Sequence, residues 1–223
     1  YEGLEGLTIT VNDGTININA SDDGINAAGG TDSSGFGGFG HDAFSADSDA
    51  NIYINGGTIT INADGDGIDS NGNLYVTGGV IYVSGPESSA DGALDYNGEA
   101  TITGGTLIAA GASGMAENFG SDSTQGSILV TFTTQSAGTT ISLLDESGST
   151  LLSWQSDKTY SSVVISSPDI VVGNTYTIKA GDYETTVTMD STIYGSGMGG
   201  MGGFPGGGGF HDGGFSGNNG NNN

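Results

Sequence analysis

The chain contains no cysteine and almost no basic residues. Its 223 residues include only two Lys or Arg, Lys158 and Lys179, against 26 Asp or Glu, so the net charge is −24. The absence of cysteine excludes disulfide bonds and thiolate metal sites. The absence of a basic patch excludes nucleic acid and anionic membrane surfaces as partners. The chain also has no run of about 18 apolar residues, so we expect no membrane insertion.

The charge imbalance is greatest in residues 1–126, which hold 18 Asp or Glu and neither Lys nor Arg. The carboxylates in this part of the chain therefore cannot form salt bridges with a Lys or Arg of the same part. Short strands rich in Val, Ile, Leu and Tyr recur throughout, which argues against disorder. A folded chain of this kind has to stay highly solvated or bind cations. Bound hard cations are therefore the first expectation from charge alone.

Internal repetition is the strongest signal in the sequence. Residues 7–30, 51–72, 73–98 and 99–120 each read as a strand, a Gly turn, a second strand and an acidic loop. The aligned apolar columns are Ile9/Ile52/Leu74/Ala100, Val11/Ile54/Val76/Ile102, Ile16/Ile59/Ile81/Leu107 and Ile18/Ile61/Val83/Ala109. The turn glycines Gly14, Gly57, Gly79 and Gly105 form another column. Alternation at period 2, repeated about every 22 residues, predicts an all-β parallel solenoid, whereas a β-sandwich explains the strands but not the columns.

The remaining segments differ in composition from the repeats. Residues 30–50 are a Gly/Phe-rich insertion, either a loop or an irregular rung, and the similarity of "ADSDAN" to "IDSNGN" favours at least a partial rung. Residues 127–194 have longer alternating strands, which predict a small antiparallel β-sheet or sandwich that caps the open end of the solenoid at 1–126. Residues 195–223 are rich in Gly and Asn and are typical of a flexible tail.

Acidic residues align in the loops after the second strand of each repeat. The motifs "EGLE" (2–5), "DGIN" (23–26) and "DGID" (66–69) match position by position. One predicted column of oxygen ligands holds Glu5, Asn26, Asp47, Asp69, Asp95 and Glu117, and a second holds Glu2, Asp23 and Asp66. Stacked rungs set such carboxylates about 5 Å apart, where they repel unless an ion lies between them. We therefore predict Ca²⁺ in a structural role; ordinary Asp and Asn turn chemistry is the alternative.

Catalysis is not expected from these residues. A polysaccharide lyase needs an Arg or Lys base, and the predicted solenoid has neither. A hydrolase needs two carboxylates held apart, but pairs such as Asp64 and Asp66 are too common here to be specific. His41 and His211 lie in Gly-rich segments, which are typical of loops. The sequence therefore predicts a protein that is not an enzyme.

Three tyrosines are candidate contacts for carbohydrate. Tyr53 and Tyr75 occupy the same outward position on adjacent rungs, so we expect them to lie side by side, and Tyr82 points outward from the neighbouring face. Exposed rings in register can stack on sugars. The alternative is that these rings pack under the insertion or the tail, whose phenylalanines also need burial.

Several motifs together carry a resemblance to a known family. They are "YEGLEG", "SDDGINAAGG" before a Gly/Phe insertion, "NADGDGIDSNG", "GALDYNG", "ITGGTLIAAGASGMAE" and "SSVVISSP". As a set they resemble a family of secreted bacterial carbohydrate-binding β-helix proteins that are themselves similar to polysaccharide lyases. The resemblance implies a right-handed parallel β-helix with calcium between rungs. It also implies non-catalytic binding of plant-wall polysaccharide, particularly polygalacturonate.

Two functions follow as hypotheses. The first is an extracellular, calcium-dependent module that binds acidic polysaccharide of the pectin type, in which cations bridge an acidic protein to an acidic glycan. The second is a self-assembling subunit of an extracellular filament or surface layer, because solenoids with open ends can stack end to end. In both hypotheses calcium stabilises the rungs.

Overall fold

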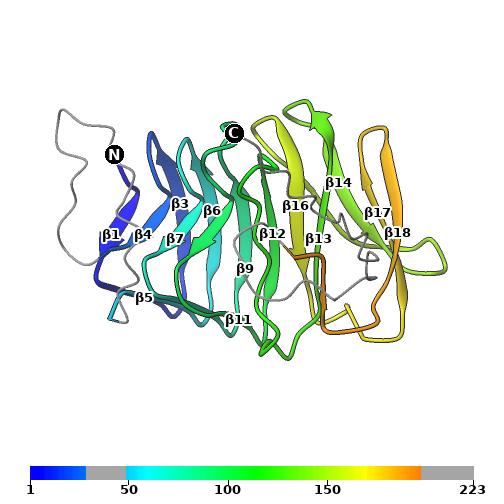
Figure 1. Ribbon diagram of the computed structural model, residues 1–223, viewed down its shortest axis with the longest axis horizontal. Coiled ribbons are helices and arrows are strands. Elements are labelled where there is room, and N and C mark those ends of the chain that lie inside the picture. Colours follow the sequence, from blue (N-terminus) through cyan, green and yellow to red (C-terminus); the bar gives the residue numbers. More distant parts are fainter. Residues whose placement is uncertain (29–48, 197–223) are drawn as a thin grey trace, which may run out of the picture.

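The computed structural model describes residues 1–28 and 49–196, and the regular structure in these ranges consists of β-strands (Figure 1). The strands lie side by side along the long axis of the molecule, with β1 at one end and β18 at the other. No helix long and apolar enough to span a membrane occurs in these ranges. The predicted all-β class is confirmed.

The first twelve strands form three sheets, which the chain visits in turn. Sheet A contains β1 (Leu4–Gly6), β4 (Ile25–Ala27), β7 (Ile68–Ser70) and β10 (Leu94–Tyr96). Sheet B contains β2 (Thr8–Val11), β5 (Asn51–Ile54), β8 (Asn73–Val76) and β11 (Ala100–Ile102). Sheet C includes β3 (Thr15–Ala20), β6 (Thr58–Ala63), β9 (Val80–Ser84) and β12 (Thr106–Gly111). We call one passage through the sheets a repeat, and all neighbouring strands of successive repeats are parallel.

The pairing is in register, as the apolar columns predict. In sheet B, Ile9 pairs with Ile52 and Ile52 with Leu74. In sheet C, Ile18 pairs with Ile61 and Ile61 with Val83. These columns build one core that lies between the sheets, and the central members are completely buried. Each buried Ile, Leu or Val contributes about 1.5–3 kcal/mol relative to an exposed position, so the repeated columns are the main source of stability in this part of the chain.

The turn between the strands of sheets B and C requires glycine. Gly14, Gly57, Gly79 and Gly105 have φ angles of 106°, 88°, 93° and 91°. These values lie in the left-handed region, which residues with a side chain rarely adopt. The predicted column of turn glycines is confirmed.

The prediction of a loop or a partial rung in residues 30–50 falls almost entirely on residues that the structure does not describe, and the strands on either side of this segment pair with each other. Strand β3 pairs directly with β6, and β4 pairs directly with β7. No strand of another segment separates them, because parallel neighbours at hydrogen-bonding distance leave no room for one. Residues 29–48, which include Asp47 and His41, lie outside the described residues.

The carboxy-terminal strands extend sheet C and add a fourth sheet. Strands β13 (Ser127–Gln135) and β16 (Tyr160–Ser166) join sheet C beyond β12 in antiparallel pairs, and β19 (Ile193–Tyr194) lies parallel to β13. Sheet D is antiparallel and contains β14 (Thr140–Leu144), β15 (Thr150–Gln155), β17 (Thr175–Ala180) and β18 (Tyr183–Thr188). The predicted antiparallel sheet is confirmed, and the structure adds that β13, β16 and β19 belong to sheet C and not to sheet D.

A second core forms between sheets C and D. It contains Ile108 of β12 and Val163 of β16, packed with Ile141 and Leu143 of β14. The register explains where this core begins. The outward column runs from Asn17 and Thr60 to Tyr82 and Ile108, so polar side chains give way to an aromatic and then an aliphatic one where sheet D covers the face. Residues 197–223 lie outside the described residues.

Candidate metal centre

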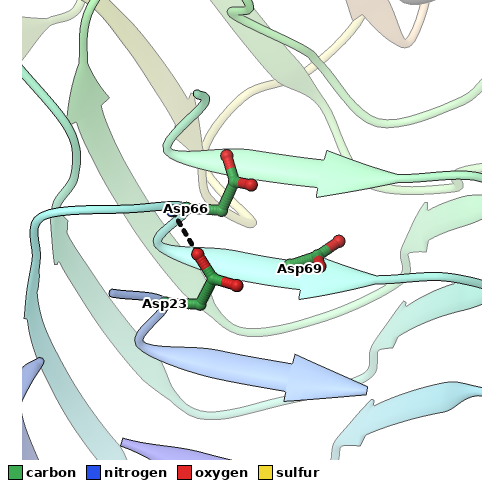
Figure 2. A group of neighbouring side chains, drawn as sticks. All are labelled: Asp23, Asp66 and Asp69. Atoms are coloured by element: carbon green, nitrogen blue, oxygen red, sulfur yellow. Dashed lines mark hydrogen bonds between the residues drawn. The ribbon is translucent and has the colours of Figure 1, made fainter. Parts of the chain in front are cut away.

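Three aspartates from two successive repeats gather on one side of sheet A. Asp23 lies just before β4, Asp66 lies just before β7, and Asp69 lies within β7. Each offers a carboxylate oxygen, and these oxygens lie within 4.8 Å of one another. Figure 2 shows Asp23 and Asp66 one above the other and Asp69 on the strand that follows Asp66. Asp23 and Asp69 are 7% and 5% exposed, so the group is partly withdrawn from water.

Backbone hydrogen bonds hold the first two carboxylates in place. The Asp66 amide donates to Asp23 Oδ1 at 2.7 Å (Figure 2), and the Gly92 amide donates to Asp66 Oδ1. Each carboxylate thus accepts a hydrogen bond from the next repeat. Such bonds to charged acceptors are about twice as strong as neutral ones, so the parallel stacking itself orients the candidate ligands.

Gly24 and Gly67, which follow Asp23 and Asp66, allow the repeats to approach each other closely. The Gly24 amide donates to the Asp66 carbonyl at 2.8 Å, and the Gly67 amide donates to the Gly92 carbonyl at 3.0 Å. A Cβ atom on Gly24 would collide with the Gly67 carbonyl and with the Ile61 side chain. Glycine is therefore required here for close backbone contact, which explains the recurring "DG" pair before sheet A.

Asn26 places an unsatisfied acceptor next to the three aspartates. It pairs in register with Asp69, and its Nδ2 donates to Asp23 Oδ2 at 3.3 Å. Its Oδ1 is buried and makes no hydrogen bond with any described residue, and the side chain is only 4% exposed. Buried acceptors are almost always satisfied, so this oxygen calls for a partner. A cation bound by the aspartates would provide one.

The electrostatics of the group favour a bound cation or a bound proton. Burial raises the pKa of Asp66 to about 9, with a smaller contribution from the neighbouring carboxylates of Asp95, Asp23 and Asp69 and against the opposing effect of the Gly92 hydrogen bond. The donor set consists of carboxylate and amide oxygens without nitrogen or sulfur. Oxygen ligands of this kind suit Ca²⁺ or Mg²⁺ rather than softer metals. The residues present therefore fit a hard divalent cation.

The two predicted columns are present as stacks, but only part of each joins the group. Glu5, Asn26, Asp69 and Asp95 pair in register in sheet A. The Gly3 amide donates to the Asp23 carbonyl, which places Glu2 in line with Asp23 and Asp66. Glu5 is exposed and Glu2 half-buried, and both belong to the first repeat. Neither of them, nor Asp95, is in the three-aspartate group.

Glu117 lies close enough to Asp95, the last paired member of the first column, for the two carboxyl groups to interact electrostatically. It is buried, and its Oε2 makes no hydrogen bond with any described residue. Burial raises the pKa of Glu117 to about 7, with a further contribution from the Asp95 carboxylate. Asp47, the remaining predicted member, lies outside the described residues, and the column passes directly from Asn26 to Asp69.

Lys158 is a residue near the centre that the repeat pattern does not reveal. Its amine donates to the Ala63 carbonyl at 2.6 Å and forms an ion pair with Asp64. The hydrogen bond that the amine donates to Asp64 Oδ1 and the positive charge of Lys158 lower the pKa of Asp64. Asp64, in the part of the chain that has no basic residue of its own, is thus neutralised by a lysine from the carboxy-terminal part. No periodic signal identifies a contact across 94 residues, and the only hint is the scarcity of lysine.

The three tyrosines predicted to contact carbohydrate have different stacking partners. The rings of Tyr53 and Tyr75 are stacked with centroids 5.2 Å apart and planes 15° apart, so their predicted proximity is confirmed. Because these rings cover each other's inner faces, a sugar has access only to an outer face or an edge. Tyr82 stacks instead on Trp154, with centroids 5.5 Å apart, and packs against the second core. Tyr82 points outward from sheet C as predicted, but Trp154 of sheet D covers one face of its ring.

Comparison of the chain with protein-family models, with curated proteins and with solved structures finds no match. The interpretation of the candidate metal centre therefore depends on its geometry and chemistry.

Proposed function

We propose that the protein is a non-catalytic, secreted, calcium-binding protein that binds acidic polysaccharide of the pectin or polygalacturonate type. The observation that carries this proposal is the group of Asp23, Asp66 and Asp69 beside the unsatisfied Asn26 Oδ1. Three carboxylates and an amide oxygen from two repeats are a suitable partial ligand set for Ca²⁺, and water or a sugar carboxylate can complete it.

The proposal also includes the way in which sheets A, B and C are joined. The chain visits sheets B, C and A in the same order in successive repeats, and alternate residues of each strand enter one shared core. We propose that the sheets at 1–126 close into a right-handed parallel β-helix. In this arrangement residues 127–194 are the cap and residues 195–223 a tail.

Charge supports a role for calcium in glycan binding. A protein with a net charge of −24 repels an acidic polysaccharide unless cations lie between them. Calcium at the three-aspartate group can bind protein carboxylates on one side and glycan carboxylates on the other. The outer face of the Tyr53–Tyr75 pair offers apolar contact to a sugar ring.

The non-catalytic part of the proposal follows from the lack of an available base. Among the described residues Lys158 is engaged by Asp64 and the Ala63 carbonyl, and Lys179 pairs with Glu184 on sheet D. A lyase that removes a proton from a sugar therefore has no free amine at this centre.

The test is binding of metal-stripped protein to Ca²⁺ by calorimetry, followed by binding to polygalacturonate in calcium, in magnesium and in chelator. We expect one or more Ca²⁺ sites, and glycan binding that requires calcium. The Asp69→Asn variant should lose both, while Asp122→Asn, an exposed control, should keep both. Polygalacturonate binding that survives chelation, or wild-type protein that takes up no calcium, would contradict the proposal.

A specific observation also favours filament assembly as a second candidate. In the described part of the chain β1, β2 and β3 are the terminal strands of sheets A, B and C, so all three present unpaired backbone edges at the same end. Exposed edges of this kind are templates for pairing with another chain. Light scattering and electron microscopy at increasing protein concentration test this; a monomer at all concentrations would exclude it.

A further inference from the structure

We propose that Lys158 is a positioning residue for the candidate metal centre: it anchors the segment 63–66 so that the Asp66 carboxylate faces Asp23 and Asp69. The inference rests on the proposed metal site and assigns a role to a residue in the turn between β15 and β16, outside the repeats. It couples the carboxy-terminal strands to the centre.

The turn at residues 157–159 contacts the ends of two successive strands of sheet C. The Asp157 amide donates to Ser84 Oγ at 3.0 Å, at the end of β9. Lys158 binds the Ala63 carbonyl and Asp64, at the end of β6. The Thr159 amide and hydroxyl both donate to Glu87 Oε1, at 3.0 and 2.7 Å. Three consecutive residues thus hold two neighbouring repeats.

Only Gly65 separates this anchor from the candidate ligand Asp66. The Gly65 amide donates to the Asp22 carbonyl at 3.1 Å, and a Cβ atom on Gly65 would collide with the Asp23 carboxylate. The next amide, that of Asp66, donates to the same Asp23 carboxylate. Lys158, Asp64, Gly65, Asp66 and Asp23 are therefore connected by direct contacts, and a shift of Asp64 displaces Asp66.

The burial of Lys158 distinguishes this contact from an ordinary surface ion pair. The Lys158 side chain is 14% exposed, while the Asp64 side chain is 66% exposed. The exposed carboxylate alone gives little stability because water screens it. The second bond, from the amine to the Ala63 carbonyl, fixes the lysine to the backbone. The amine therefore has a defined place at the end of β6, as a positioning role requires.

The charge of Lys158 and its contacts have opposite effects on cation binding. A positive charge near the centre repels a cation, so loss of the charge by itself strengthens calcium binding. Loss of the anchor loosens Asp66 and weakens calcium binding, because residues behind metal ligands commonly contribute tenfold or more to affinity. The sign of the change in affinity therefore separates positioning from simple electrostatics.

The chain provides a matched control in its other basic residue. Lys179 pairs with Glu184 at 3.0 Å on sheet D, and Lys158→Met and Lys179→Met each remove one positive charge from the same protein. The experiment is Ca²⁺ calorimetry on the full metal-stripped chain, with Tb³⁺ luminescence as a second readout. We expect Lys158→Met to raise the calcium Kd about tenfold. Lys179→Met should stay within about twofold of the wild type, as surface charges usually do.

A second variant keeps the inference testable if Lys158→Met does not fold, as judged by circular dichroism in chelator. Lys158→Arg keeps the charge but replaces the compact ammonium with a planar guanidinium that does not fit the same contacts. Positioning predicts weaker calcium binding for Lys158→Arg, and electrostatics alone predicts no change. Unchanged or tighter binding in both Lys158 variants would overturn the inference while leaving the metal site intact. Wild-type protein that binds neither ion would overturn both.

Discussion

The Asp66 amide donates a 2.7 Å hydrogen bond to the Asp23 carboxylate across 43 residues of chain. This bond joins equivalent positions of two successive repeats. Parallel in-register pairing places each residue beside its counterpart, so a motif that recurs in the sequence becomes a cluster in space. The candidate metal centre arises in this way.

Replacing Asp69 with Asn should have opposite effects in calcium and in chelator. In chelator we expect a melting temperature equal to or above that of the wild type, because the substitution removes the Asp69 charge, which opposes the ionisation of Asp66. In calcium at 100 times the Kd, the wild type should gain about 2.7 kcal/mol and the variant much less. Differential scanning calorimetry measures both. A uniform loss of stability in the two conditions would point to a packing defect instead.

The metal-free protein should lose stability as the pH rises. The folded pKa of Asp66 is about 9 and its ordinary value is 3.8, so the folded state binds more protons between these values. Its contribution is fully present below about pH 4 and is lost as the pH rises through about 9. Glu117, with a pKa of about 7, acts in the same direction at lower pH. Urea unfolding in chelator at pH 5, 7 and 9 should show a falling midpoint, with a smaller fall for Asp66→Asn.

Gly67→Ala should be strongly destabilising. A Cβ atom at this position would collide with the Ala93 carbonyl and a Val83 methyl, and overpacking of this kind costs about 1–3 kcal/mol or more. Gly6→Ala is the control, because its nearest neighbour would be Ile9 Cγ1 at 3.5 Å, an ordinary contact. Chemical denaturation should show a large loss for the first variant and a change within about 0.5 kcal/mol for the second. An equal loss of stability in the two variants would show that the backbones of successive repeats do not approach each other closely at Gly67.

Asn118→Ala should release strand β19. The Asn118 Nδ2 donates to the carbonyls of Tyr194 and Gly195 at 2.9 and 3.0 Å, and its Oδ1 accepts a 2.6 Å bond from the Ser127 hydroxyl. Their loss leaves polar groups without partners at a cost of about 1–3 kcal/mol. Hydrogen exchange should speed up at residues 193–195, while the exposed-site variant Asn97→Ala leaves exchange there unchanged.

Tyr75→Ala and Tyr82→Ala should affect different properties. Tyr75 lies half-buried on the outer face of sheet B, stacked only on Tyr53 among the described aromatic residues, so its loss should weaken polysaccharide binding about three- to tenfold. Tyr82 stacks on Trp154 against the second core, so its loss should lower the melting temperature. Glycan affinity chromatography and calorimetry distinguish the two. Equal loss of affinity in both variants would contradict this assignment.

Much of the fold can be predicted from the sequence because the stacking contacts repeat. Ile18, Ile61 and Val83 occupy the same column in the alignment and pair in the structure. The same logic predicts the alignment of Asn26 with Asp69. The insertion at residues 30–50 separates the first two repeats in the sequence, yet Ile18 pairs directly with Ile61. The register between these two repeats therefore follows the apolar columns and not the spacing along the chain.

Contacts outside the repeats could not be predicted in this way. The ion pair of Lys158 with Asp64 and the stacking of Tyr82 on Trp154 join the repeats to residues that have no counterpart in another repeat. Neither periodicity nor alignment indicates such partners. Their positions depend on how β16 pairs with β12 and how sheet D lies over sheet C.

The sequence by itself determined the all-β class, the columns of stacked residues and the gathering of carboxylates, because each follows from periodic side chains in parallel strands. Only the tertiary structure decided which carboxylates meet. It brought Asp23, Asp66 and Asp69 together, left Glu5 exposed, and used Lys158 to neutralise Asp64. The physical reason is that stacking fixes neighbours along the repeat axis, whereas burial and contacts between sheets depend on the packing of the whole chain.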